Sequence, residues 1–172
     1  MSALEAWMAL AWRSGLPDAE RWERAKGMGP GEGEFAEEVL ERERADLRAL
    51  ERIGVRLVRA IDPEFPERWR APPAPVLLQV AGNAALLGAP GVEFVAGARG
   101  SEGARLADLL DRGGRACVLL SKGLLSARGE LRALAEPIAD GSLALVSAEP
   151  PRASWGPARE RRRAALLALL RG

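Results

Sequence analysis

Apolar residues follow the helical repeat through much of the first third of the chain. Residues 1–12 and residues 35–53 each carry an apolar stripe at helical spacing, and a shorter helix containing Trp22 is predicted between them. Glycine and proline in residues 26–33 predict a loop. This pattern predicts a small helical module over residues 1–54.

Beyond residue 54, short apolar runs alternate with helical segments. Runs typical of strands occupy residues 55–61, 76–80, 92–98, 116–120 and 143–147. Helical patterns occupy residues 104–110, 130–139 (interrupted by Pro137) and 157–170. Such alternation, with glycines at strand ends, is typical of an open, mostly parallel α/β sheet, here of about four to five strands.

The clearest unit of the predicted sheet lies in residues 91–120. A buried strand is followed by three evenly spaced glycines, a helical pattern and a second apolar run, which together predict one βαβ unit. The glycines are Gly97, Gly100 and Gly103. Such a turn lets an anionic ligand approach the backbone at a helix N-terminus, and a tight turn without a ligand explains the glycines equally well.

Basic residues follow two of the predicted strand ends. Arg99 stands in the Gly-rich turn, and Lys122 follows the next strand of the unit. Because ligands of open α/β sheets bind outside the carboxyl ends of the strands, we expect both cations at one edge of the sheet. This placement favours recognition of phosphate.

The charge of the chain is unevenly distributed, although its formal net charge is only +1. Residues 152–172 hold six basic side chains and one acidic side chain, whereas residues 1–54 are net acidic. The arginines Arg159, Arg161, Arg162 and Arg163 are crowded together. A basic end on a nearly neutral body indicates either a polyanionic partner or a solvated helix face.

The composition removes most kinds of catalytic site. The chain has one cysteine and no histidine, tyrosine or threonine, which excludes an internal disulfide, a Cys/His zinc site and a Ser–His–Asp triad. We therefore expect a protein that is not an enzyme and that needs no metal or cofactor. No apolar run approaches the roughly 18 residues of a membrane span, so a cytoplasmic protein without membrane contact is expected.

Several motifs, in the right order, resemble the DNA-processing protein A (DprA/Smf) family. The most specific block is Gly-Val-x-Leu at residues 54–57, Asp-Pro-x-Phe-Pro at residues 62–66 and a Pro-Pro to Gly segment at residues 72–82. A Gly-Gly-Arg segment and a Val-Ser-x-Glu-Pro-Pro segment follow in residues 113–124 and 145–151. The chain resembles a shortened, diverged member of that family.

Two alignments to the family remain open. Gly97-Ala98-Arg99 stands where the family has a strand ending in Gly-Ser-Arg. Alternatively, residues 95–100 correspond to a later Ser-Gly-x-Ala-x-Gly strand, and the earlier strand is deleted. In either case one β/α unit of the family is missing.

The resemblance implies a Rossmann-like domain over residues 55–172 that binds single-stranded DNA through a basic pocket. It also implies a homodimer that hands the strand to the RecA recombinase during natural transformation, an activity in which no bond is broken. Two other functions stay open: a module that binds a nucleotide or another small ligand, and a degenerate paralogue with only a protein–protein role.

The candidate nucleic-acid-binding residues follow from the strand ends, the basic segment and the resemblance. They are Gly97, Arg99, Gly100, Ser101, Lys122, Arg159, Arg161, Arg162 and Arg163. We expect their charges to gather in one shallow cleft, with Arg99 as the pocket arginine. Trp155 is the one aromatic residue placed to stack on a base beside these charges, but a packing role is favoured for it. Cys117, inside an apolar strand, is expected to be a buried, inert thiol.

Overall fold

The computed structural model describes residues 3–28 and 35–171, so most of the predicted 26–33 loop lies outside the described residues. The described chain forms a five-stranded sheet with the order β1-β2-β5-β4-β3. The strands are β1 (Val55–Arg59), β2 (Leu77–Gly82), β3 (Val92–Val95), β4 (Arg115–Leu120) and β5 (Leu143–Ser147). The predicted α/β class and strand positions are confirmed.

Four of the five strands run in one direction. β4 lies parallel to both β3 and β5, whereas β2 lies antiparallel to its two neighbours, β1 and β5. The parallel strands β3, β4 and β5 therefore end at one edge of the sheet, which we call the carboxyl edge. This mostly parallel, Rossmann-like sheet carries its candidate site at that edge.

Helices connect the parallel strands. α4 (Gly100–Asp111) joins β3 to β4, and α5 (Arg128–Ala133) and α6 (Ala135–Asp140) join β4 to β5. The helical segment between β4 and β5 is interrupted at Leu134 rather than at Pro137, where the sequence predicts the break. Pro137 lies in the first turn of α6, where a proline removes no helical hydrogen bond. Across the described ranges, no helix combines the length and apolar character that crossing a membrane requires.

α7 (Pro157–Arg171) closes the fold at the carboxyl edge. Its Leu166 and Leu167 are buried, and the Leu166 carbonyl accepts a hydrogen bond of 3.0 Å from the Trp69 indole. Trp69 lies in the short 3₁₀ helix η1 (Glu67–Trp69) and packs edge-to-face on Phe94 of β3, with ring centroids 5.7 Å apart. α7 is thus fixed to the sheet by a buried aromatic pair, which sets where its arginines can reach.

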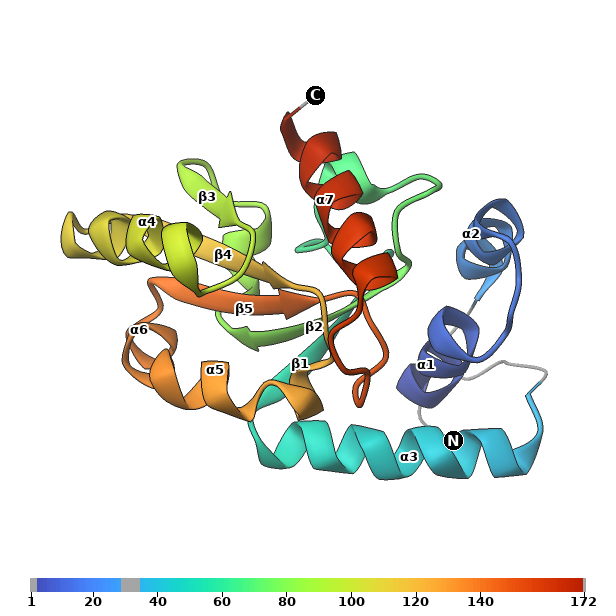
Figure 1. Ribbon diagram of the computed structural model, residues 1–172. Helices are drawn as coiled ribbons and strands as arrows, with labels where there is room; N and C mark the ends of the chain where they lie inside the picture. Colours follow the sequence, from blue (N-terminus) through green and yellow to red (C-terminus); the bar gives the residue numbers. More distant parts are fainter. Residues whose placement is uncertain (1–2, 29–34, 172) are drawn as a thin grey trace.

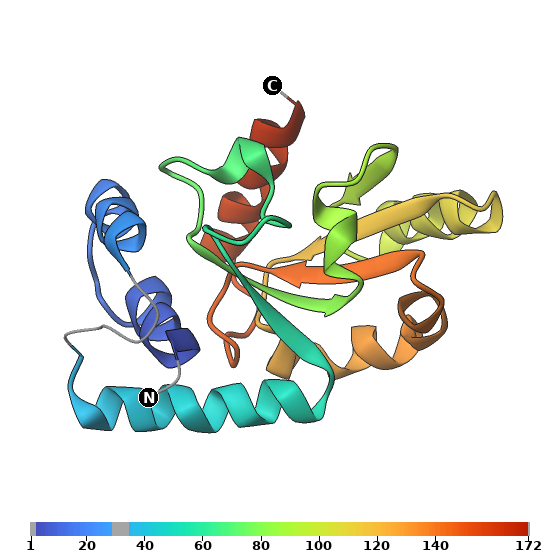
Figure 2. The same cartoon turned by 180° about the vertical axis from the view of Figure 1, so that it is seen from behind.

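The predicted helical module consists of α1 (Ala3–Trp12), α2 (Asp18–Gly27) and α3 (Glu37–Arg52). Figures 1 and 2 show α1 and α2 beyond the carboxyl edge, with α7 standing between them and the sheet, whereas α3 extends beneath the sheet to the start of β1. Trp7 and Leu50 of the module belong to the same hydrophobic cluster as the sheet. The Trp12 indole also donates a hydrogen bond of 3.1 Å to the Ala148 carbonyl after β5. The division into two domains at residue 54 stays a prediction, since the module and the sheet share one core.

Candidate nucleic-acid interface

Arg99 and Lys122 meet at the carboxyl edge, as predicted, but they meet around a carboxylate. Arg99 is the N-cap residue of α4, and Lys122 follows β4. Glu130 Oε1 lies 2.6 Å from Lys122 Nζ and 3.4 Å from an Arg99 guanidinium nitrogen. The Arg99 side chain is 84 % exposed, whereas that of Lys122 is 23 % exposed. Arg99 therefore has donors free for a ligand, and Lys122 is held mainly by Glu130.

Two opposing influences set the pKa of Glu130. Burial of the side chain alone would raise the pKa, because it disfavours the charged form. The hydrogen bonds from Lys122 and from the backbone, together with the charges of Lys122 and Arg99, outweigh burial and lower the pKa from its ordinary value. Glu130 is therefore ionised at neutral pH and cancels one of the two positive charges beside it.

Arg159 and Arg162 of α7 face a second buried carboxylate, Glu149. Arg162 binds both oxygens of Glu149, with Nε and Nη2 distances of 2.9 and 2.8 Å, and Arg159 Nε lies 3.3 Å from Oε2. The hydrogen bond to Glu149 raises the pKa of Arg162. These two arginines form a paired, bidentate contact within the protein.

Arg163 occupies a third position, on the side of β3 and β4. It forms an ion pair with Glu160 and donates a hydrogen bond of 3.5 Å to the Leu119 carbonyl. A Cβ on Gly97, whose φ is +91°, would lie 3.1 Å from the Arg163 guanidinium. Gly97 therefore gives room to an internal arginine, a role that the sequence did not indicate. Burial lowers the pKa of Arg163, and the charge of Glu102 opposes that shift.

The expectation of one common cationic cleft is wrong. The cations divide among three carboxylates, Glu130, Glu149 and Glu160, because α7 directs successive arginines to different sides. Within residues 152–170, Arg161 is the one arginine without a carboxylate partner, since Arg152 pairs with Asp46 of α3. The basic end seen in the sequence is thus largely an internal ion-pair network.

A shallow groove lies beside Arg161. It has a volume of about 570 Å³ and is lined by Ala96, Glu102, Trp155, Pro157, Glu160, Arg161, Arg163, Ala164 and Leu167. Trp155 is 61 % exposed, and its indole nitrogen donates a hydrogen bond of 2.8 Å to Glu160. The packing role favoured for Trp155 is therefore wrong. The groove places an exposed aromatic ring next to an exposed, unpaired arginine.

The remaining candidates lie in the Gly-rich turn next to this groove. Gly100 opens α4 with a φ of +60°, a conformation that glycine adopts without strain, and no atom would contact a Cβ there. Ser101 is exposed in the first turn of α4. A Cβ on Gly103 would lie 2.6 Å from the Ala98 carbonyl oxygen, so this glycine permits close packing of the turn.

Sequence reasoning missed the residues that hold the carboxyl edge together. Gln79 of β2 is fully buried; its amide donates to the Glu149 carbonyl, and its oxygen accepts a hydrogen bond of 3.0 Å from the Leu124 amide. Ser147 Oγ donates a hydrogen bond of 2.6 Å to the Lys122 carbonyl. The loops after β4 and β5 are thereby joined. A single glutamine within the apolar run of β2 was the available signal.

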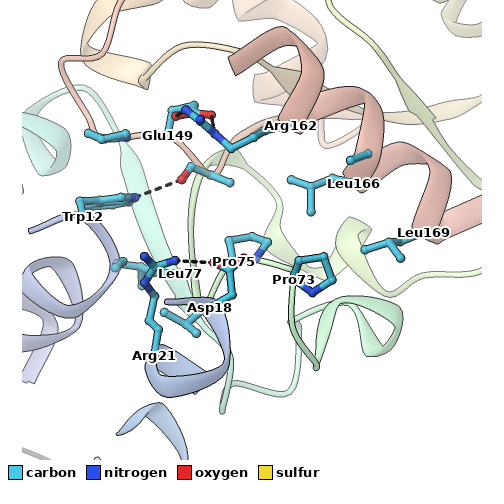
Figure 3. Close-up of a pocket in the computed structure, with 15 residues that line it drawn as sticks. Trp12, Asp18, Arg21, Pro73, Pro75, Leu77, Glu149, Arg162, Leu166 and Leu169 are labelled. Atoms are coloured by element: carbon cyan, nitrogen blue, oxygen red, sulfur yellow. Dashed lines mark hydrogen bonds and ion pairs between the residues drawn. The ribbon is translucent and has the colours of Figure 1, made fainter. Parts of the chain in front are cut away.

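A second hollow of about 520 Å³ lies between the helical module and α7 (Figure 3). Its walls are mainly apolar and include Trp12, Pro73, Pro75, Leu77, Leu166 and Leu169. The two arginines in its wall are already paired, Arg21 with Asp18 at 3.0 Å and Arg162 with Glu149. This hollow offers no unpaired cation to a nucleotide phosphate, and it lies apart from the Gly-rich turn.

The described ranges, 3–28 and 35–171, contain no group of three His, Cys, Asp or Glu side chains that could hold a metal ion. Cys117 is buried in β4, and burial raises the pKa of its thiol to about 12. The expected burial of Cys117 is confirmed. So high a pKa leaves almost no reactive thiolate near neutral pH.

Comparison with known proteins gives a likeness of fold. No protein-family model and no curated protein matches the sequence. Among solved structures, the chain is similar to DNA processing protein A (DprA) from Streptococcus pneumoniae, with 18 % sequence identity and a TM-score of 0.48. The alignment covers 87 % of this chain and 63 % of that protein, so this chain spans less than two thirds of its length.

Proposed function

We propose that this protein binds single-stranded DNA along the groove between Trp155, Arg161 and the Gly-rich turn. The observation that carries the proposal is the exposed indole of Trp155 beside the unpaired guanidinium of Arg161. Aromatic rings that stack on bases, next to cations that contact the backbone, are the recurrent means of binding single strands. A duplex keeps its bases stacked on one another, so it cannot use the indole in this way.

Arg99 lies close in the chain to residues that line the groove. Ala96 and Glu102 line the groove and lie on either side of Arg99 in the chain, and Ser121, next to Lys122, donates a hydrogen bond of 2.8 Å to Glu160 in its wall. A strand whose base stacks on Trp155 can therefore place one phosphate near Arg161 and another near Arg99. The hydrogen bond from the indole to Glu160 restrains the ring and lowers the entropy lost on stacking.

The charge balance around the carboxyl edge predicts a modest electrostatic contribution to the affinity for DNA. The six candidate cations face Glu102, Glu130, Glu149 and Glu160, which leaves a net charge of +2 around the edge (6 − 4). Each phosphate neutralised on a single strand contributes about −0.7 to the slope of log affinity against log salt, so two contacts give a slope of about −1.4. Stacking must then supply a large share of the affinity.

The finer role follows the sequence motifs of the DprA/Smf type. The protein acts in the cytoplasm as a homodimer, binds the strand without breaking a bond, and hands it to a RecA-type recombinase during DNA uptake. The motifs at residues 54–82 and 145–151 support this role. A release step fits the shallow groove, because a ligand that is transferred must not be enclosed.

A titration of labelled oligothymidylate by fluorescence anisotropy tests the proposal. We expect Trp155→Ala to weaken binding by about tenfold, the loss of one base stack. Arg161→Ala should flatten the salt slope by about 0.7, the loss of one phosphate contact. Arg112→Ala is the matched control, because Arg112 lies at the other end of α4 and pairs with Asp108. Binding that is absent, or equal in all four proteins, would contradict the proposal.

A further inference from the structure

Glu130 has an unusual position for a surface ion pair. It lies in the first turn of α5, its side chain is only 8 % exposed, and both of its partners approach the same oxygen, Oε1. The partners come from two separate strand ends, Arg99 after β3 and Lys122 after β4. The carboxylate thus occupies the point on which the two cations of the carboxyl edge converge.

The two contacts differ in strength. Lys122 Nζ lies 2.6 Å from Oε1 and is largely shielded from water, which makes a strong charge-assisted hydrogen bond. The Arg99 contact is long, at 3.4 Å, and its guanidinium is mostly exposed. A phosphate that arrives from solvent can therefore take over Arg99 readily, but it must displace Glu130 to reach Lys122.

We propose that Glu130 is an internal competitor for the backbone phosphate of the bound strand. This inference rests on the proposed function. The carboxylate holds Lys122 in place while the site is empty, and it takes the lysine back when a strand leaves. It lowers the affinity for simple anions, so that ligands which also stack on Trp155 are favoured. The residue thereby sets both the selectivity and the ease of release.

A purely structural Glu130 would behave differently. Its replacement would alter the melting temperature of the protein and leave the affinity for DNA and its salt dependence unchanged. The competitor role requires that the effect on DNA binding depend on Lys122, because the freed lysine is the group that gains a phosphate. Salt slope and dependence on Lys122 therefore separate the two roles.

The test is a salt-series titration of oligothymidylate with Glu130→Gln, which keeps the shape and the hydrogen-bond acceptor but removes the charge. We expect binding about tenfold tighter than for the native protein, the size of one charge-assisted hydrogen bond. We also expect a salt slope steeper by about 0.7, since one more cation is free. Glu136→Gln, on the exposed face of the neighbouring α6, is the control for the same change in net charge.

Three further variants complete the test. In a Lys122→Met background, Glu130→Gln should no longer tighten binding. Glu130→Asp, which keeps the charge but draws it back, should tighten binding less than Glu130→Gln and serves if the glutamine variant folds poorly, as judged by circular dichroism. Tighter binding that persists without Lys122, or that Glu136→Gln reproduces, overturns the inference while leaving the proposed function intact. No binding by any protein removes the proposed function, and the inference with it.

Discussion

Glu130 and Glu149 have similar charged neighbours but differ in the geometry of their contacts. Each is a buried carboxylate at the carboxyl edge that faces two cations. Glu149 is bound through both oxygens by Arg162, and its own backbone carbonyl accepts a hydrogen bond from Gln79. Glu130 is bound through one oxygen, and Arg99 beside it is mostly exposed.

The geometry of the ion pair, more than the charge, decides which arginine can bind a ligand. Arg162 is held in one orientation by its bidentate pair with Glu149, so turning it towards a ligand would break two charge-assisted hydrogen bonds. The long contact of the exposed Arg99 side chain contributes little stability and can be broken at low cost. This difference supports the proposed binding role of the Glu130 region and a structural role for the Glu149 region.

The largest effect on stability is expected from replacing Gln79, which joins the loops after β4 and β5. Gln79→Leu keeps the volume but removes the partners of the Leu124 amide and the Glu149 carbonyl. Two buried backbone groups left without partners should lower the free energy of unfolding by about 3 kcal/mol. Urea denaturation measures this loss. A change below about 1 kcal/mol would mean that the loops after β4 and β5 do not depend on Gln79.

The second prediction compares the two carboxylates directly. Glu149→Gln should lower the free energy of unfolding by about 1–2 kcal/mol, because a bidentate pair is lost, with a discount for the exposure of Arg162. Glu130→Gln should cost less, about 1 kcal/mol, since the glutamine keeps an acceptor for Lys122 and the long contact with exposed Arg99 contributes little. Thermal unfolding of the two variants checks the order. Equal losses, or the reverse order, would break the comparison.

The third prediction concerns pH. The pKa of Glu130 is lowered in the folded protein from the ordinary value of 4.5, so the unfolded chain takes up this proton first. The stabilisation from its ionised form is present above pH 4.5 and is lost as the pH falls through the lowered folded pKa. The stability difference between the native protein and Glu130→Gln should therefore shrink in acid. A difference that grows in acid would show the opposite shift.

The smallest effect is the reactivity of Cys117, which is buried in β4. Its thiol has a pKa of about 12 through burial, so a thiol reagent should react only when the sheet unfolds. The rate of labelling by Ellman's reagent should rise with denaturant in step with global unfolding. Rapid labelling of the native protein would mean that the edge opens locally.

The sequence predicts the fold well, because local patterns determine it. The strand runs, the βαβ unit at residues 91–120 and the helix of α7 all appear where apolar periodicity places them. The reversed direction of β2 was not predictable in this way. Periodicity gives the location of a strand, whereas its neighbours depend on contacts between distant segments.

The site was predicted less completely, for a physical reason. Arg99 and Lys122 converge as strand-end reasoning requires. Their carboxylate partner, and those of Arg162 and Arg152, come from other elements, so a count of charges along the chain could not show them. The exposure of Trp155 likewise depends on the path of the loop before α7, which its neighbours in the sequence do not fix.

The location of the bound strand tests the central claim most directly. Oligodeoxynucleotides containing 5-bromodeoxyuridine can be photocrosslinked to the protein, and the modified peptide can be identified by mass spectrometry. We predict crosslinking at Trp155, in the open groove, and none at Trp12, in the hollow behind the Arg162–Glu149 pair. Crosslinking at Trp12, or at neither tryptophan despite measurable binding, would contradict the assignment of the binding surface.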